Sequence, residues 1–380
     1  MTDKASGEVD PACGNRIVTL TRDLVEIPST ESRPSERRRA FRMCRNHLES
    51  VPGLEFHEGD SGGFESMVVV PKGVREPEIM LVGHLDVIDH PDVGVFRTEI
   101  RDGRIVGPGS GDMKGQCAIM MELFMGLHRR HPGLPLGLAL TSDEERGGEN
   151  GVGWLFGEAG WRCGMAIVPD GGSMNDITVA EKGILHLRFH AKGRESHAAR
   201  PWLAPNALMT LHSALGRLHD HFASKVIPDS GDHWYPTFVP TVIRTPNEMV
   251  NCIPAEVEAF ADLRFPPPDT VAGMMAIVRE MAGPGVEVEM LVGAESTHLA
   301  PDPLYLTVTE ELTGQAVNQV RASGGSDARF IAAQGIPVIL SRPLVGNLHG
   351  VDEWIDIESM TLYHRICETY VLRRLVQNAG

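Results

Sequence analysis

Histidines and carboxylates follow several short apolar segments of this sequence. His84 comes just after residues 79–82, Glu145 after 136–140, Asp170 after 165–168, and His349 a few residues after 336–340. Asp112 lies in a glycine-rich loop, GPGSGDMKG (107–115), before an apolar stretch. Oxygen and imidazole ligands without thiolates are typical of zinc, cobalt or manganese sites. We expect these five residues to bind divalent metal, and the set suits two ions that share one carboxylate.

Two more carboxylates beside these candidate ligands could serve the chemistry without binding metal. Glu144 precedes Glu145 and would be free to take a proton from water, a general-base role worth about 10²–10⁴ in rate. Asp86 lies two residues after His84 on the same side of an extended segment, so it could fix the tautomer of the imidazole. Carboxylates are costly to bury unless cations accompany them, and no matching set of Lys or Arg stands beside these.

The apolar segments that precede the candidate ligands have the length and composition of buried strands. Residues 79–82, 136–140 and 165–168 are continuously apolar, as in strands covered on both faces. Residues 116–127 are apolar almost all round, as in a helix packed against a sheet. This alternation predicts an α/β fold with a doubly wound mixed sheet. Ligands of such sheets bind beyond the carboxyl ends of the strands, so the candidates should converge.

The pattern changes near residue 182. Residues 185–191 alternate apolar and polar side chains, and a helical stripe follows at 208–222. Further elements are expected in the order strand, strand, helix and strand, at 238–244, 257–263, 271–281 and 286–291. This β-α-β-β-α-β order predicts a ferredoxin-like α+β domain. We expect it at residues 182–293, inserted into a catalytic domain formed by residues 1–181 and 294–380.

The composition excludes several classes of partner. The chain has 380 residues and a formal net charge of −16, which repels the phosphate backbone, so we expect no nucleic-acid partner. No apolar run approaches the ~20 residues that span a bilayer, so no membrane partner is expected. The six cysteines lack C-x-x-C spacing, and the first residues lack the pattern of a secretory signal. A cytoplasmic location is the expectation.

Several short motifs, spread in order along the chain, carry a family resemblance. They are GHLDV (83–87), GDMKG (111–115), DEE (143–145), GRESHAARPWLAPNA (193–207), NCIP (251–254), DLR (262–264), GGSD (324–327) and HGVDE (349–353). In these motifs the chain resembles the co-catalytic zinc metallopeptidases and deacylases, which include aminoacylase, acetylornithine deacetylase, succinyl-diaminopimelate desuccinylase and carnosinase. The resemblance implies that the inserted domain is a lid and dimerisation domain, and that the protein is a homodimer.

The resemblance also implies which residues bind each metal. His84 and Asp170 would bind one ion, Glu145 and His349 the other, and Asp112 would bridge them. Two divalent ions per subunit are therefore expected, with zinc preferred over cobalt or manganese. Many deacylases and carboxypeptidases of the family have Glu where this chain has Asp170, whereas di- and tripeptidases more often have Asp, which favours peptide substrates slightly.

The remaining residues of the motifs have implied catalytic and substrate-binding roles. Glu144 resembles the general base and Asp86 the residue that supports the first histidine ligand. His197 matches a histidine of the inserted domain that reaches the partner's active site and stabilises the oxyanion. The positions that match substrate-binding residues of the family are Arg264, Asn251, Gly325 and Ser326. The implied reaction is hydrolysis of an amide bond in a small substrate with a free carboxylate, an N-acyl amino acid or a di- or tripeptide.

Two other functions remain open on the sequence alone. GGSDA (324–328) approximates a nucleophile elbow before a helix, with His349 downstream, so Ser326 could serve a serine hydrolase. That interpretation leaves the carboxylate cluster unexplained. The chain could also be a metal-stabilised binding or assembly protein without catalysis, although a purely structural site does not require the extra carboxylate of Glu144.

Overall fold

The computed structural model describes residues 11–228, 231 and 233–376, and these divide into two compact units. The first unit spans residues 1–179, 299–320 and 326–380, and the second spans 180–298 and 321–325. The sequence analysis expected an insertion at 182–293, so the second unit is longer at both ends. It also takes in a short later segment. Among the described residues, no helix is both long and apolar enough to cross a membrane.

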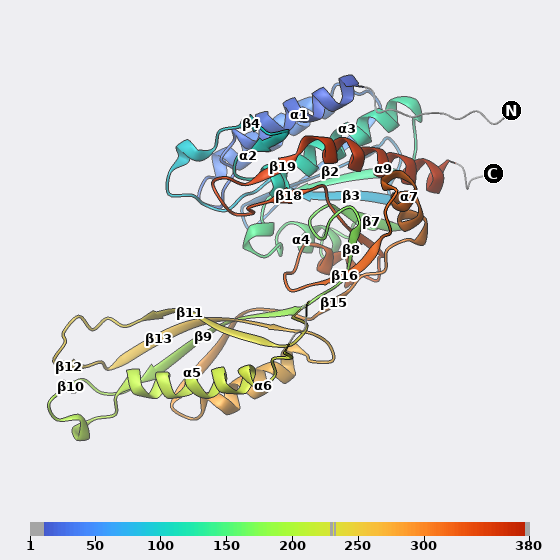
Figure 1. The fold of residues 1–380 in the computed structure, drawn as a ribbon. Coiled ribbons are helices and arrows are strands. Elements are labelled where there is room, and N and C mark those ends of the chain that lie inside the picture. Colours follow the sequence, from blue (N-terminus) through green and yellow to red (C-terminus); the bar gives the residue numbers. More distant parts are fainter. Residues whose placement is uncertain (1–10, 229–230, 232, 377–380) are drawn as a thin grey trace. The chain divides into compact units, whose positions relative to one another are not determined.

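The first unit is built on a mixed sheet with helices on both faces (Figure 1). Its helices are α1 (Pro11–Val25), α2 (Pro34–Leu48), α3 (Gly115–Arg130), α4 (Val152–Phe156), α7 (Pro303–Thr313), α8 (Ala328–Ala332) and α9 (Ile357–Leu375). Its main strands are β1 (Leu54–Ser61), β2 (Phe64–Pro71), β3 (Ile79–His84), β6 (Leu136–Thr141), β7 (Met165–Val168), β8 (Asp176–Glu181) and β17 (Val338–Leu340). They are ordered β1-β2-β6-β3-β7-β17-β8, and β16 (Asn318–Ala322) also pairs with β8. The four strands from β6 to β17 run parallel and the outer ones antiparallel, so the predicted α/β class with a mixed sheet is confirmed.

Strand side chains of the first unit alternate between two apolar cores. In β3, Ile79 and Leu81 pack into the core that contains residues of α1, α3 and α9. Met80 and Val82 of the same strand pack into a second core with residues of α4 and α8. Because both faces are covered, the strand is apolar at every one of these positions. The continuous apolar runs in the sequence reflect this double burial.

A small antiparallel sheet in the first unit brings two distant loops together. Its strands are β4 (Glu99–Arg101), β5 (Arg104–Val106), β18 (Val345–Gly346) and β19 (Trp354–Asp356), in the order β18-β19-β5-β4. Trp354 of β19 pairs with Val106 of β5. The glycine-rich loop begins directly after β5, and residues 347–353 join β18 to β19. The sheet therefore places these two loops side by side.

The second unit has a four-stranded antiparallel sheet with two helices. Its principal elements, in chain order, are β9 (Gly183–Lys192), α5 (Ala207–Ala223), β11 (Thr237–Arg244), β13 (Glu256–Phe265), α6 (Val271–Ala282) and β14 (Val286–Ala294). The short strands β10 (Ser196–His197) and β12 (Cys252–Ile253) pair with each other, and β15 (Thr297–His298) pairs with the end of β8. The sheet order is β11-β13-β9-β14. Leu187 and Phe189 of β9 face a core with both helices, whereas Arg188 between them is only half-buried.

Candidate metal centre

His84 is held at the end of β3 with one ring nitrogen available. The side chain is 1% exposed. A Cβ on the preceding Gly83 would lie 2.6 Å from Met120 Cε, which shows how closely β3 and α3 pack there. The Nδ1 atom of His84 lies 3.1 Å from the main-chain oxygen of Asp86 and 3.4 Å from its Oδ1. An Nδ1–H donated to these oxygens leaves the lone pair of Nε2 for a metal.

Asp112 lies between two imidazoles in the described structure. Its Oδ1 is 3.2 Å from His84 Nε2, and its Oδ2 is 3.5 Å from His349 Nε2. The same nitrogen of His349 is 3.3 Å from Glu145 Oε2. A carboxylate that presents one oxygen to each of two ligand groups has the arrangement of a bridging ligand in a two-metal site.

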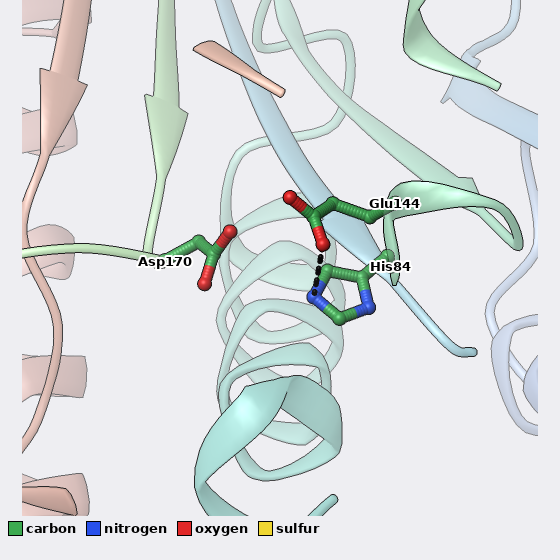
Figure 2. A group of neighbouring side chains, drawn as sticks. All are labelled: His84, Glu144 and Asp170. Carbon is green, nitrogen blue, oxygen red and sulfur yellow. Dashed lines mark ion pairs between the residues drawn. The ribbon is translucent and has the colours of Figure 1, made fainter. Parts of the chain in front are cut away.

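The candidate ligands form two groups whose donor atoms lie within 4.8 Å of one another. One group is His84, Glu144 and Asp170, and Figure 2 shows the two carboxylates gathered around the His84 ring. The other group is Asp112, Glu145 and His349. All five predicted ligands are thus in the two groups. Glu144 joins the first group although the sequence analysis gave it the role of base.

Short elements at the ends of strands deliver the acidic side chains to this position. Glu144 and Glu145 open a 3₁₀ turn, η3 (Glu144–Arg146), which starts just after β6. Asp170 follows β7 by two residues. Since β3, β6 and β7 are parallel neighbours, their carboxyl ends meet at one edge of the sheet. This is the edge at which open α/β sheets bind ligands.

Negative charge exceeds positive charge in the described part of this cluster. Burial raises the pKa of Glu144 and Asp170 well above the usual range, and the negative charge of Asp112 adds to this effect. The guanidinium of Arg342, 3.9 Å from Asp170 Oδ1, opposes it only in part. Burial also raises the pKa of Glu145. Divalent cations would relieve this repulsion, so the donor set fits metal ions by charge as well as by ligand type.

The two imidazoles respond to the same excess of negative charge. Burial lowers the pKa of His84, but hydrogen bonds that its ring donates to Asp112 and Asp86 outweigh burial and raise the pKa well above 6.5. Hydrogen bonds with Asp112 and Glu145 raise the pKa of His349 to about 10. Metal binds the neutral imidazole, so binding at either histidine would compete with protonation.

His349 has an unusual backbone and an open side chain. Its φ is 64°, in the left-handed region that costs a residue other than glycine about 1–3 kcal/mol. The side chain is 54% exposed, whereas those of the other four predicted ligands are at most 12% exposed. Glu353, to which the sequence analysis gave no role although it quoted HGVDE, accepts the main-chain N–H of His349. The two residues lie four apart in the same loop, between β18 and β19.

Asp86 contacts two candidate ligands. Besides its contacts with His84, its Oδ2 accepts the main-chain N–H of Glu145 at 3.0 Å. The spacing of the sequence predicted only the contact with His84. The carboxylate of Asp86 thus links the end of β3 to η3.

Besides Gly325, the second unit carries three of the predicted site residues, and two of these three are neighbours. His197 in β10 is exposed, pairs with Cys252 in β12, and accepts the N–H of Ala199 through Nδ1. The main-chain oxygen of Asn251 accepts the N–H of Ala198 at 2.9 Å. The third residue, Arg264, forms a two-pronged ion pair with Asp262, through Nε at 2.9 Å and Nη2 at 3.0 Å.

Gly325 and Ser326 lie at the boundary between the two units. Gly325 belongs to the second unit and Ser326 to the first. The Ser326 side chain is buried, and its Oγ accepts the N–H of Ala328 at 3.3 Å. In the part of the chain that is described, no hydrogen bond joins this Oγ to a histidine, and His349 faces Asp112 instead. The geometry does not support a serine nucleophile.

Comparison with known proteins now identifies the family. Residues 80–373 match peptidase family M20/M25/M40. The chain belongs to this family. A succinyl-diaminopimelate desuccinylase of Thioalkalivibrio sulfidiphilus is 31% identical over 334 residues, which cover 80% of this chain and 85% of that protein. The family resemblance predicted from the motifs is therefore confirmed.

Solved structures of peptidases share the fold. A tripeptidase from Staphylococcus aureus superposes with a TM-score of 0.77 and 17% identity, covering 98% of this chain and 100% of that one. An M20 family metallo-carboxypeptidase from Sulfolobus solfataricus gives 0.78 and 14%, covering 93% and 98%. The protein is thus a metal-dependent hydrolase that acts on amide bonds.

Proposed function

We propose that this M20 hydrolase cleaves the amide bond of a small substrate that carries a free carboxylate, an N-acyl amino acid or a short peptide. The observation that carries the proposal is the position of Asp112, with one oxygen toward His84 and the other toward His349. The carboxylate of Glu144 lies at the same place, 4.0 Å from His84 Nε2. A site with a shared carboxylate and a spare one is suited to two-metal hydrolysis.

Two divalent ions, zinc in preference to cobalt or manganese, would be held by the two groups. His84 and Asp170 would bind one ion, Glu145 and His349 the other, and Asp112 would bind both. When bound, the ions would act as Lewis acids toward the scissile carbonyl and lower the pKa of water. This assignment leaves Glu144 outside the ligand set.

Glu144 is the proposed general base. Asp112 Oδ1 lies closer to His84 Nε2 than Glu144 Oε2 does, at 3.2 Å against 4.0 Å, so we assign the ligand position to Asp112. Burial raises the pKa of Glu144, which makes its carboxylate a stronger base than an exposed one. In the proposed reaction Glu144 takes a proton from the attacking water and delivers it to the nitrogen of the leaving amine.

The assignments in the second unit rest on the family resemblance. His197 of one subunit would donate a hydrogen bond to the oxyanion in its partner's site. Arg264 would bind the substrate carboxylate, since its planar fork suits two parallel hydrogen bonds. Asn251, Gly325 and Ser326 would contact the rest of the substrate.

A homodimer formed through the second unit is part of this proposal. Trp202, Met249 and Val250 of that unit are 77%, 62% and 101% exposed in the single chain. Large apolar side chains at the surface are favourable when a partner covers them. Sedimentation of the purified protein at micromolar concentration should give twice the mass of the chain, and a monomer that turns over at the full rate would contradict the role of His197.

The substrate class has support from two directions. The desuccinylases that are 28–31% identical to this chain favour a dicarboxylic acyl group on an amino acid. Asp170, where many deacylases have Glu, favours a peptide. A substrate screen on the metal-loaded protein distinguishes an acyl-amino acid substrate from a peptide substrate. The screen contains dipeptides, tripeptides, and acetyl-, succinyl- and longer acyl-amino acids. Two bound ions without hydrolysis of any member would contradict the proposed function.

Replacement of Glu144 tests the mechanism. We expect Glu144→Gln to lower kcat by about 10²–10⁴ while both ions remain bound, because the residue moves protons and is not a ligand. Elemental analysis and turnover are measured on the same sample. Glu149→Gln is the matched control, since Glu149 is exposed in the loop after η3 and its loss should leave both unchanged. Unchanged turnover in Glu144→Gln would remove Glu144 from the reaction.

A further inference from the structure

Glu353 is a buried carboxylate that neither the proposed reaction nor the ligand set uses. It is 2% exposed and lies just before β19. We propose that Glu353 is a positioning residue, which holds Asp112 and His349 in register and so controls binding at the Glu145–His349 metal position in particular. This inference rests on the two metal positions of the proposed function, and it adds how the second of them is built.

The carboxylate of Glu353 contacts the loops of two candidate ligands at once. Its Oε1 accepts the N–H groups of Gly111 at 2.7 Å and Asp112 at 2.8 Å. Its Oε2 accepts the N–H of His349 at 3.2 Å. One side chain thus connects main-chain segments that are more than 230 residues apart in the sequence.

The main chain of Glu353 strengthens this connection. Its carbonyl oxygen accepts the N–H of Gly107 at 2.7 Å and the hydroxyl of Ser110 at 3.2 Å. Its own N–H donates to the carbonyl of Gly350 at 3.2 Å. Glu353 therefore contacts both ends of the segment that leads to Asp112, as well as the loop that carries His349.

Neither ligand is held by regular structure of its own. The backbone φ of Asp112 is −140°, which is not helical, and that of His349 is 64°. The main chain at both residues therefore depends on specific hydrogen bonds to stay in place. Three N–H groups, one buried and two partly buried, are directed at one point and require an acceptor with two oxygens. A carboxylate meets this requirement, whereas a glutamine amide offers one oxygen and an NH₂ group that cannot accept the third N–H.

The first metal position has a different support. Asp86 contacts His84 through Nδ1, and it also accepts the N–H of Glu145, a ligand of the second position. Loss of the Glu353 carboxylate removes support from Asp112 alone at the His84–Asp170 position, but from both Asp112 and His349 at the other position. The expected defect is therefore larger at the second ion than at the first.

Metal titration of Glu353→Gln tests this selectivity. Metal-free protein is titrated with Co²⁺, and calorimetry and the visible spectrum follow each ion separately. We expect the wild type to bind two ions, and the variant to bind the second about 10–100-fold more weakly, the usual cost of losing a residue that orients a ligand, with a smaller loss at the first ion. The spectrum of the second ion should also change.

Glu122→Gln is the matched control. Glu122 is a second carboxylate of the first unit that is 2% exposed, and it pairs with Arg16 and His47 at 2.7 Å each. Its replacement should cost stability but leave both metal affinities unchanged. Glu353→Asp, which keeps two oxygens on a shorter side chain, should give a smaller loss at the second ion, and it replaces Glu353→Gln if that variant does not fold.

The outcomes separate this inference from the proposed function. Equal metal affinities in the wild type and the folded variant, or an equal loss at both ions, would overturn the positioning role. A wild type that binds two ions but hydrolyses no substrate would overturn the function and leave the titration as a valid test. A wild type that binds no ion would overturn both.

Discussion

Asp262 provides a quantitative test of how the second unit holds Arg264. Both oxygens of Asp262 face the guanidinium, and Oδ2 also lies 3.1 Å from His186 Nε2. Burial raises the pKa of Asp262, but the hydrogen bonds with His186 and Arg264 outweigh burial and lower it from 3.8 to about 2. We predict that Asp262→Asn destabilises the second unit and raises KM for a carboxylate substrate.

The pKa shift sets the size of the effect on stability. A fall from 3.8 to about 2 corresponds to about 2.4 kcal/mol, at 1.36 kcal/mol per unit. The side chain is 30% exposed, so solvent screening reduces the expected loss to about 1–2 kcal/mol. Because the pKa is depressed in the folded state, the contribution is present above pH 3.8 and is lost as the pH falls toward 2.

Hydrogen exchange in urea measures the loss within the second unit. Amides of β9 and β13 report on opening of that sheet, whether or not the two units unfold together. The difference between variant and wild type should be full at pH 7 and smaller at about pH 3. Glu258→Gln is the control on the same strand, since Glu258 pairs at 2.9 Å with Arg188, which is more exposed than Arg264, and its loss should cost less stability than that of Asp262.

Two results would refute this reasoning. Equal stability of Asp262→Asn and wild type at pH 7 would show that the ion pair contributes nothing to the fold. A difference that persists undiminished at about pH 3 would show that the stabilisation does not come from the charge of Asp262. An unchanged KM would further show that Arg264 does not need Asp262 to bind substrate, or does not bind it.

Two further changes test other parts of the structure. We expect Asp86→Ala to weaken metal binding about 10–100-fold, because Asp86 contacts both His84 and the N–H of Glu145. Competition with a coloured chelator measures the metal affinity. An unchanged affinity would show that Asp86 does not hold these two residues in place for metal. We expect Phe189→Ala to lower the unfolding free energy of the second unit by about 3–5 kcal/mol, because Phe189 is fully buried against Phe238. Urea titration measures this loss, and an effect below about 1 kcal/mol would contradict the packing described.

The parts of the fold that follow from local burial could be predicted from the sequence. The segments at 79–82, 136–140 and 165–168 became β3, β6 and β7, since strands buried on both faces leave no choice but apolar residues. The order of elements in the second unit could also be predicted, because β9 and β13 alternate apolar and polar side chains. Because open α/β sheets bind ligands beyond the carboxyl ends of their strands, the predicted strands also indicated which residues could bind metal.

Elements with mixed polarity could not be predicted in the same way. The strand β1 has the sequence LEFHEGDS and pairs on one side only, with β2, so its side chains carry no clear pattern. The roles of Glu353 and Asp262 depend on the residues that they contact. Glu353 contacts the loop of Asp112, which is more than 230 residues away in the sequence. For Asp262 a clue existed: Asp and Arg two residues apart on a strand share a face and can pair.

The small sheet that joins β5 to β19 also has a consequence for biosynthesis. Asp112 is translated long before His349, which lies 237 residues later, between β18 and β19. A truncated chain that ends before residue 345 has the main parallel strands but lacks His349 and the strands on either side of its loop. During synthesis the second metal position therefore stays incomplete until residues 345–356 have been made and have joined β4 and β5.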